Sequence, residues 1–232
     1  MIVTAISAPR DTKNTKAELI KTYAQLCYQA SRQGAEIIVL PELSFEYEKP
    51  SSFERAAENS DEPGGLDVTD FLRISEVYQN TIVYGYIETD DSLLYNSACV
   101  LHAGKVISNH KKSNLSGPDY LWATESNRLM HNTIAFRDFR MGVLIGDDMI
   151  NHHEYDDRKK PFYNGNLEVI CCLLDKDIQE YPEKSWIHLA KTTGANIIVS
   201  NKKGNSCVIT NLLKVYGESS VEKNIIGGII QI

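Results

Sequence analysis

Three positions in the sequence could together carry acyl-transfer chemistry: Glu42, Lys112 and the triplet Gly146-Asp147-Asp148. Each is expected at the end of a strand: Glu42 and the triplet follow apolar runs, and Lys112 follows the strand after the turn at Gly104. In α/β sheets, ligand-binding groups gather at strand ends. A carboxylate can take the proton of a nucleophile there, and an ammonium can stabilise the developing oxyanion. The triplet begins with glycine, however, which has no side chain to act as the nucleophile.

Alternating strands and helices must position these residues. Residues 2–6 and 37–40 are short apolar runs typical of strands, and residues 16–33 between them carry apolar side chains at helical spacing. Gly34 ends this helix and Pro41 closes the second strand, directly before Glu42. Such a strand–helix–strand unit predicts a parallel pair of strands that is buried on both faces.

The remainder of the chain continues the α/β pattern. We expect a polar surface loop with a short helix at 46–66, and a hairpin turn at 103–105 that leads toward Lys112. Further helices are expected at 68–78 and 183–193, and strands at 81–87, 94–102, 141–145, 167–174 and 197–200, with two or three closing strands from 207 onward. No linker, repeat or low-complexity segment divides the chain, which favours one α/β domain over residues 1–232.

The composition excludes several classes of protein. A formal net charge of −7 argues against a nucleic-acid partner, which would need a basic face. No apolar run reaches the roughly 18 residues of a membrane helix, and the N-terminal residues lack the pattern of a signal peptide. The odd number of cysteines and the absence of a CxxC spacing favour a reduced, cytoplasmic compartment and argue against structural zinc. The five cysteines are Cys27, Cys99, Cys171, Cys172 and Cys207.

The segments around the three chemical positions resemble those of the nitrilase superfamily of carbon–nitrogen hydrolases. GAEIIVLPEL, which contains Glu42, resembles the segment that carries the general-base glutamate of that family. YNSA, GKV and HKKSNL resemble the run into the family's lysine, and Leu115 fixes the register so that the matching residue is Lys112 and not Lys111. RMGVLIGDD resembles the nucleophile segment, with Gly146 where the family has cysteine.

The resemblance covers nearly the whole chain in one colinear order, including residues 165–174, 186–204, 214–217 and 228–232. It implies a four-layer α-β-β-α sandwich. It also implies a Glu-Lys-Cys site that hydrolyses or transfers amide and nitrile carbons through a covalent thioester or thioimidate, with no metal or other cofactor. The expected ligand is therefore a small amide, acid or nitrile, and the expected assembly is a homodimer or a larger homo-oligomer.

The resemblance suggests three further site residues. The family has another glutamate in the loop after the lysine, and Asp119 is the nearest acidic residue in this sequence. Cys172 falls near a family proline at the mouth of the substrate pocket, and Asp147 directly follows the nucleophile position. We therefore treat Asp119, Asp147 and Cys172 as candidate substrate-binding residues.

Gly146 leaves three interpretations open. The chain is a pseudoenzyme that binds a ligand in an inherited pocket, or a deliberately inactivated variant, for which alanine or serine would be the commoner choice. Alternatively another nucleophile replaces the cysteine: Cys171 or Cys172, Asp147, or a water activated by Glu42. Free cysteines are most often small buried hydrophobes, which weighs against a thiol replacement.

The run HHEYDD at residues 152–157 contains the residue types of a metal site. Adjacent histidines point in different directions, and no second histidine follows at i+4, so a solvated loop is the better interpretation. This run replaces a segment that shapes the pocket in the family. Substrate preference is therefore not carried over from the resemblance.

Overall fold

In the computed structural model, the described residues are 1–7, 15–126, 133–136, 138–148, 166–176, 183–217 and 225–232. Within them the strands form two six-stranded sheets, ordered β12-β1-β2-β3-β4-β5 and β11-β10-β9-β8-β7-β6. The first sheet comprises β1 (Ile2–Ile6), β2 (Ile37–Val39), β3 (Thr81–Asp90), β4 (Leu93–His102), β5 (Lys105–Lys111) and β12 (Ile225–Ile229). The second comprises β6 (Ile134–Ala135), β7 (Arg140–Ile145), β8 (Val169–Leu174), β9 (Asn196–Asn201), β10 (Cys207–Ile209) and β11 (Val215–Tyr216).

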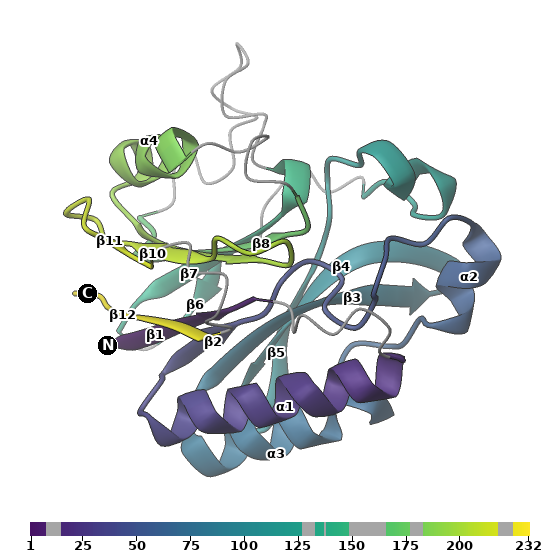
Figure 1. Ribbon diagram of the computed structural model, residues 1–232, viewed down its shortest axis with the longest axis horizontal. Coiled ribbons are helices and arrows are strands. Elements are labelled where there is room, and N and C mark those ends of the chain that lie inside the picture. The colour runs from purple at the N-terminus through teal and green to yellow at the C-terminus, as the bar shows by residue number, and fades with distance from the viewer. Residues whose placement is uncertain (8–14, 127–132, 137, 149–165, 177–182, 218–224) are drawn as a thin grey trace.

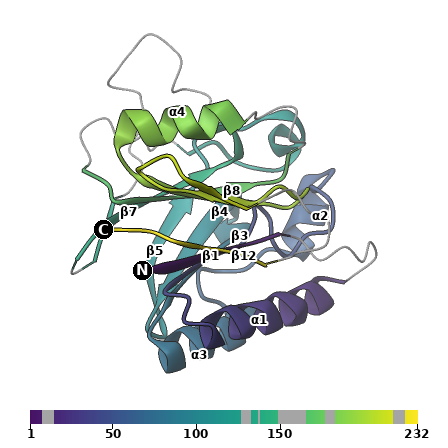
Figure 2. The same ribbon diagram turned by 60° about the vertical axis from the view of Figure 1, so that its left-hand side comes forward.

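Helices cover the outer faces of both sheets. Figure 1 shows α1 (Lys16–Arg32) and α3 (Thr69–Tyr78) below the first sheet and α4 (Glu183–Thr193) above the second. The rotated view keeps the same order of layers (Figure 2). The shorter helices are α2 (Phe53–Glu58), η1 (Leu66–Val68) and η2 (Gly117–Leu121). This arrangement confirms the predicted α-β-β-α sandwich.

Alternating side chains explain why the sheets lie inside the sandwich. Along β2, Ile37 and Val39 belong to the apolar cluster between the two sheets, whereas Ile38 belongs to the cluster between the first sheet and the helices α1 and α3. Along β8, Cys171 faces the other sheet and Cys172 packs toward α4. Both faces of these strands are therefore buried, as expected for the central strands of an α/β fold.

The first strand–helix–strand unit is also as predicted. Thr15 and Glu18 form a capping box at the start of α1, which pairs two N–H groups that the helix itself leaves without partners. Gly34 follows the end of the helix with a φ of 86°, a left-handed conformation that glycine adopts without a Cβ clash. β1 and β2 then pair in parallel, so that β2 delivers the chain to Pro41 and Glu42.

Some details differ from the sequence-based expectations. The stretch at 46–66 does contain a short helix, α2, but Glu46, Pro50 and Ala56 within it are buried. This stretch packs against the segment that follows Glu42, where Ala56 shares an apolar cluster with Leu43. Neither η2 nor the two-residue strand β6 was expected from the sequence pattern. The run at 152–157 lies outside the described residues.

Two features are absent from the described part of the chain. None of its helices combines the length and the apolar character needed to cross a membrane. Its histidine, cysteine, aspartate and glutamate side chains form no group of three or more that could hold a metal ion.

Candidate active site

Glu42 and Lys112 meet in the interior of the protein. Lys112 is the residue directly after β5, and its backbone N–H donates to the carbonyl of Asn96 on the neighbouring strand. Its Nζ lies 2.7 Å from Oε1 of Glu42, and both side chains are fully buried. The adjacent Lys111 instead reaches Asp90, with a partly exposed side chain. The alternation along β5 thus directs Lys112, and not Lys111, to Glu42.

A second carboxylate shares the same ammonium group. Oδ2 of Asp119, a fully buried residue of η2, lies 2.6 Å from Nζ of Lys112. Asn96 on β4 donates from Nδ2 to Oε1 of Glu42 at 2.8 Å, and its Nδ2 lies 3.5 Å from Oδ1 of Asp119. The structure therefore brings Asp119, the expected acidic residue after the lysine, into contact with Lys112. Whether Asp119 acts on a ligand stays a prediction.

Lys49 supplies a second cation, which no sequence pattern marks. Its Nζ lies 3.6 Å from Oε1 of Glu42 and 3.7 Å from Oδ1 of Asp119, and its side chain is largely buried. These distances exceed those of hydrogen bonds but allow strong charge attraction, because water is mostly excluded. We call Glu42, Lys49, Asn96, Lys112 and Asp119 the charged cluster.

The charged cluster keeps its central carboxylate and ammonium ionised. Burial by itself would raise the pKa of Glu42, but the charges of Lys112 and Lys49, with hydrogen bonds from Lys112 and Asn96, hold it well below its usual range. Burial would likewise lower the pKa of Lys112, but Glu42 and Asp119 raise it above its usual value. Near neutral pH, Glu42 is therefore a hydrogen-bond acceptor that holds protons weakly.

Gly146 directly faces the charged cluster. It follows the last residue of β7 with a φ of 48°, in the left-handed region. A Cβ built on Gly146 would lie 2.8 Å from Nζ of Lys112, and 3.0 and 3.2 Å from Oε2 and Oε1 of Glu42. A side chain at position 146 would thus project between the carboxylate and the ammonium, where a nucleophile would have to stand.

Asp148 connects the Gly146 turn to the loop that carries Lys112. Its Oδ1 accepts hydrogen bonds from the backbone N–H groups of Ser113 and Asn114, at 2.8 and 2.9 Å. Its Oδ2 lies 3.2 Å from the backbone nitrogen of Ile145 and 3.1 Å from Nε2 of His110. One buried carboxylate therefore fixes the end of β7 against the start of the Lys112 loop.

Gly85 on β3 lets the turn at Glu42 approach the sheet closely. A Cβ on Gly85 would lie 2.6 Å from the backbone nitrogen of Leu43, 2.7 Å from the carbonyl oxygen of Pro41 and 2.9 Å from Cα of Glu42. Backbone atoms cannot move aside as the end of a flexible side chain can. Glycine at position 85 therefore contributes to the placement of Glu42.

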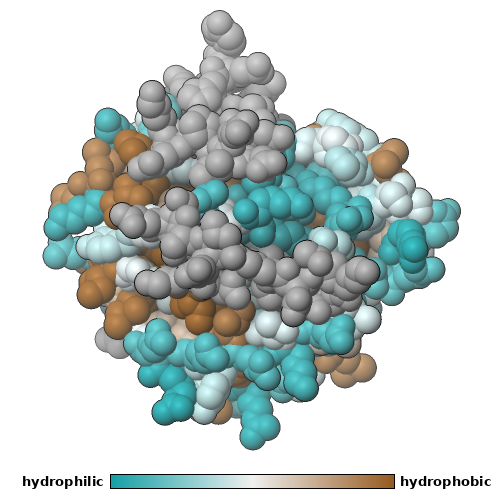
Figure 3. Space-filling view, viewed as in Figure 1, coloured by the Kyte–Doolittle hydropathy of each residue, from teal (hydrophilic) through white to brown (hydrophobic). Residues whose placement is uncertain are grey.

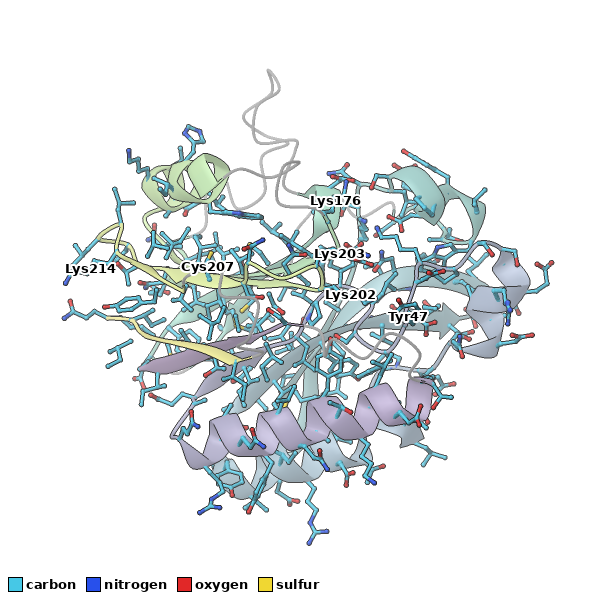
Figure 4. The ribbon with its side chains drawn as sticks, in the orientation of Figure 1. Tyr47, Lys176, Lys202, Lys203, Cys207 and Lys214 are labelled. Carbon is cyan, nitrogen blue, oxygen red and sulfur yellow. The ribbon has the colours of Figure 1, made fainter. Side chains whose placement is uncertain are left out.

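The ends of three adjacent parallel strands meet beside the charged cluster. β7 leads to Gly146, β8 to Asp175, and β9 to the lysine pair Lys202-Lys203. The backbone N–H of Asp175 donates to Oε2 of Glu42 at 3.2 Å, and Nζ of Lys202 lies 3.5 Å from Oδ2 of Asp175. Figure 4 shows Lys202 and Lys203 on the same face of the molecule as Lys176 and Tyr47. Their position agrees with the rule that ligand groups collect at the carboxyl ends of strands.

Asp147, the neighbour of Gly146, is paired with Lys176. Nζ of Lys176 lies 2.8 Å from both carboxylate oxygens of Asp147, which is itself largely buried. The structure thus places Asp147 next to Gly146, with its charge directed at Lys176, which follows the end of β8. Its predicted contact with a ligand is not tested by this arrangement.

The structure does not bring Cys171 or Cys172 to the charged cluster. All five cysteines of the chain lie among the described residues, and all are buried. Sγ of Cys171 lies 3.5 Å from Sδ of Met141 between the sheets, and Cys172 lies in the apolar cluster beside α4. Burial raises the pKa of both thiols. The alternation of β8 turns the side chain of Cys172 toward α4, and its contact with a ligand stays a prediction.

Comparison with known families matches most of the chain. A family model described as carbon-nitrogen hydrolase matches residues 3–199. A nitrilase from Pyrococcus abyssi (strain GE5 / Orsay) is 34% identical over 138 residues, which cover 58% of this chain and 47% of the nitrilase. The matched region thus spans about half the length of that relative.

Solved structures share the fold at low sequence identity. A cysteine-to-serine mutant of the Nesterenkonia AN1 amidase, from the nitrilase superfamily, is similar with a TM-score of 0.76 and 16% identity, covering 98% of this chain and 90% of the amidase. A cysteine-to-alanine mutant of that amidase in complex with butyramide gives a TM-score of 0.76, over 98% of this chain and 89% of the amidase. A glutamine-dependent NAD+ synthetase from Acinetobacter baumannii, in complex with ADP, has a TM-score of 0.75 at 20% identity, over 97% of this chain and 44% of the synthetase.

Proposed function

The chain belongs to the carbon–nitrogen hydrolase family, within the nitrilase superfamily, and from that premise we propose that it binds a small amide or related acyl compound at the charged cluster without forming a covalent intermediate. Glu42 accepts a hydrogen bond from the N–H group of the ligand. Lys112 donates to its carbonyl oxygen. Covalent turnover stops there, because no side chain at position 146 can attack the carbonyl carbon.

One observation carries the proposal: the direction of the missing side chain at Gly146. A Cβ at that position would lie between Nζ of Lys112 and the carboxylate of Glu42, at 2.8 and 3.0 Å. Those two groups are the ones that an acyl-transfer site needs around its nucleophile, as oxyanion stabiliser and base. Their retention around a glycine supports binding chemistry more than turnover.

The other candidate nucleophiles are poorly placed for a rescue. The burial of all five thiols, and the raised pKa of Cys171 and Cys172, argue against a displaced catalytic cysteine. Asp147 has both of its carboxylate oxygens occupied by Lys176. Glu42 would be a weak base for activating a water molecule, since its pKa is held low.

Calorimetric titration with butyramide, the amide bound by the amidase relative, tests the proposal. We expect saturable binding to the wild-type chain, and binding at least about tenfold weaker in Glu42→Gln, which removes the charged acceptor but keeps the shape. The matched control is Glu54→Gln, on the exposed face of α2. Equal affinity in all three proteins, or no binding to any of them, would reject the proposal.

A further inference from the structure

Helices α1 and α3 form the outer layer over the first sheet, and a groove lies between them. α1 connects β1 to β2 and α3 leads into β3, and these three strands are parallel, so the two helices run in the same direction side by side (Figures 1 and 2). Their inner faces pack on the sheet through Tyr23, Cys27 and Phe71. Where Figure 3 shows the outer surface of this layer, at the lower edge of the molecule, most residues are hydrophilic. None of the residues that line the groove belongs to the charged cluster.

The groove has the dimensions of a small-molecule site. Its volume is about 770 Å³, which lies within the usual range of ligand pockets, and every residue that lines it is in a described segment. Ala24, Ile74 and Val77 form its apolar part. Val77 is 66% exposed, so a dissolved molecule can reach these side chains directly.

Two tyrosine rings connect the helices at one end of the groove. The ring centres of Tyr28 on α1 and Tyr78 on α3 lie 6.1 Å apart, with the ring planes at 74° to each other. Tyr28 is 46% exposed, so its ring still offers surface to a ligand. A flat aromatic group fits this pair, because aromatic rings favour edge-to-face and offset contacts.

The acidic part of the lining lies at the other end of the groove. On α3, Asp70 precedes Tyr78 by eight residues, which is about 12 Å along the helix axis. On α1, Lys21 precedes Tyr28 by seven residues, which is about 10 Å. Arg73 lies three residues after Asp70, on the same side of α3. The single carboxylate of the lining is therefore at the end that also holds Lys21 and Arg73.

Arg32 is the charged residue at the tyrosine end. It lies four residues beyond Tyr28, and its guanidinium carbon is 6.0 Å from the centre of the Tyr28 ring. Arg32 is exposed and forms no ion pair with any residue in the described part of the chain. A guanidinium presents its donors in a planar fork, which matches the geometry of a carboxylate. This end therefore offers an aromatic surface and a cation side by side, in a chain whose net charge is −7.

We propose that the groove between α1 and α3 is a second binding site, which takes a small aromatic carboxylate. The ring of this ligand packs against Tyr28 and Tyr78, and its carboxylate pairs with Arg32. A neutral aromatic molecule would leave Arg32 without a counter-charge, and an aliphatic anion would leave the tyrosine rings without a flat partner. The carboxylate points to Arg32 and not to Arg73, because Asp70 repels an anion there. This site is separate from the charged cluster, so the inference does not depend on the proposed function.

The test compares three small molecules in calorimetric titrations of the full chain. Cinnamate is a flat aromatic carboxylate, cinnamyl alcohol is its neutral analogue, and octanoate is an anion without an aromatic ring. We expect cinnamate to bind about fivefold to tenfold more tightly than cinnamyl alcohol at low salt, and the difference to shrink at high salt as the charges are screened. Octanoate should bind more weakly than cinnamate.

Variants of exposed residues assign the binding to the groove. Arg32→Gln should lower the affinity for cinnamate to that for cinnamyl alcohol, whereas Arg55→Gln, on α2 outside the groove, should leave it unchanged. Val77→Glu places a negative charge in the groove and should weaken cinnamate binding at least about tenfold. Leu66→Glu is its control, since Leu66 is 93% exposed and does not line the groove. Butyramide affinity should be the same in all four variants.

Three results would overturn the inference. Cinnamate that binds no more tightly than cinnamyl alcohol or octanoate would show that the groove does not select an aromatic carboxylate. A preference that survives Arg32→Gln, or that Arg55→Gln reduces equally, would show that Arg32 does not pair with the ligand. A change from dimer to monomer in Val77→Glu, seen by sedimentation, with no cinnamate binding to the wild-type chain, would assign the groove to a contact between two copies. In each case the proposed binding of an amide at the charged cluster would stand.

Discussion

Nζ of Lys112 lies 2.7 Å from Oε1 of Glu42, although the two residues are 70 positions apart in the chain and neither side chain reaches solvent. The end of the parallel strand β2 positions Glu42, and the antiparallel hairpin of β4 and β5 positions Lys112. Asp119 and Lys49 complete the charge balance around them. The pair lies beside Gly146, a position that has no side chain, and this arrangement is what the proposed non-covalent binding rests on.

Removal of Lys112 should strongly destabilise the protein, because two buried carboxylates would lose their shared partner. We expect Lys112→Met to lower the free energy of unfolding by about 3–5 kcal/mol, measured by urea denaturation. Lys111→Met is the matched control, since the partly exposed Lys111 pairs with Asp90 and Glu88 near the surface. This variant should lower the free energy of unfolding by less than about 1 kcal/mol. A similar decrease in the free energy of unfolding in both variants would contradict a buried ion pair between Lys112 and Glu42.

The same pair predicts the response of stability to acid. Because the pKa of Glu42 is lower in the folded than in the unfolded state, its contribution is fully present above about pH 4.3 and is lost as the pH falls through the folded pKa. The pKa of Lys112 is raised, so its contribution is present below about pH 10.4 and is lost in stronger base. In urea denaturation at successively lower pH, Glu42→Gln should lose less stability than wild type on acidification. Parallel acid profiles for the two proteins would count against this assignment.

Gly85 provides a test of how Glu42 is positioned. We expect Gly85→Ala to cost about 1–3 kcal/mol of stability, because the new methyl group would meet backbone atoms of Pro41, Glu42 and Leu43 below 3.0 Å. The affinity of Gly85→Ala for butyramide should also be lower than that of the wild-type chain. Gly227→Ala, where the nearest atom to a new Cβ lies at 3.9 Å, is the control and should have little effect. The close approach of the Glu42 turn would be disproved if the two alanine variants were equally stable.

A cysteine at position 146 should be unusually reactive. In Gly146→Cys the new thiol would lie next to Lys112, whose positive charge favours the thiolate. We expect iodoacetamide to label it faster than any of the five buried native thiols, as followed by peptide mass spectrometry. If the introduced thiol reacted no faster than the native ones, the geometry of the site, and not only its nucleophile, would have been lost.

Much of the fold could be predicted from the sequence, because strands that are buried on both faces leave continuous apolar runs. The runs before Glu42 and before Gly146 predicted β2 and β7, and the spacing of residues 16–33 predicted α1 to within one residue. The parallel pairing of β1 and β2 follows from the helix between them. β6 has only two residues and leaves no periodic pattern, so it could not be predicted.

The site was predictable only where a motif marks it. Glu42, Lys112 and Gly146 stand in segments with a family pattern, whereas Lys49 is one lysine in a polar stretch and reaches the charged cluster through the fold of that stretch. A sequence match does not tell which face of β8 the thiol of Cys172 occupies, and the structure places it on the face toward α4. The predicted homo-oligomer and the cytoplasmic location stay predictions.

The most direct test of non-covalent binding is the release of ammonia from butyramide by the wild-type chain and by Gly146→Cys, with the intact mass of each protein followed in parallel. We expect the wild-type chain to bind without releasing ammonia above background and without a gain in mass, and Gly146→Cys to release ammonia. Ammonia release by the wild-type chain at the rate of Gly146→Cys, or an acyl adduct on a native residue, would contradict binding without turnover.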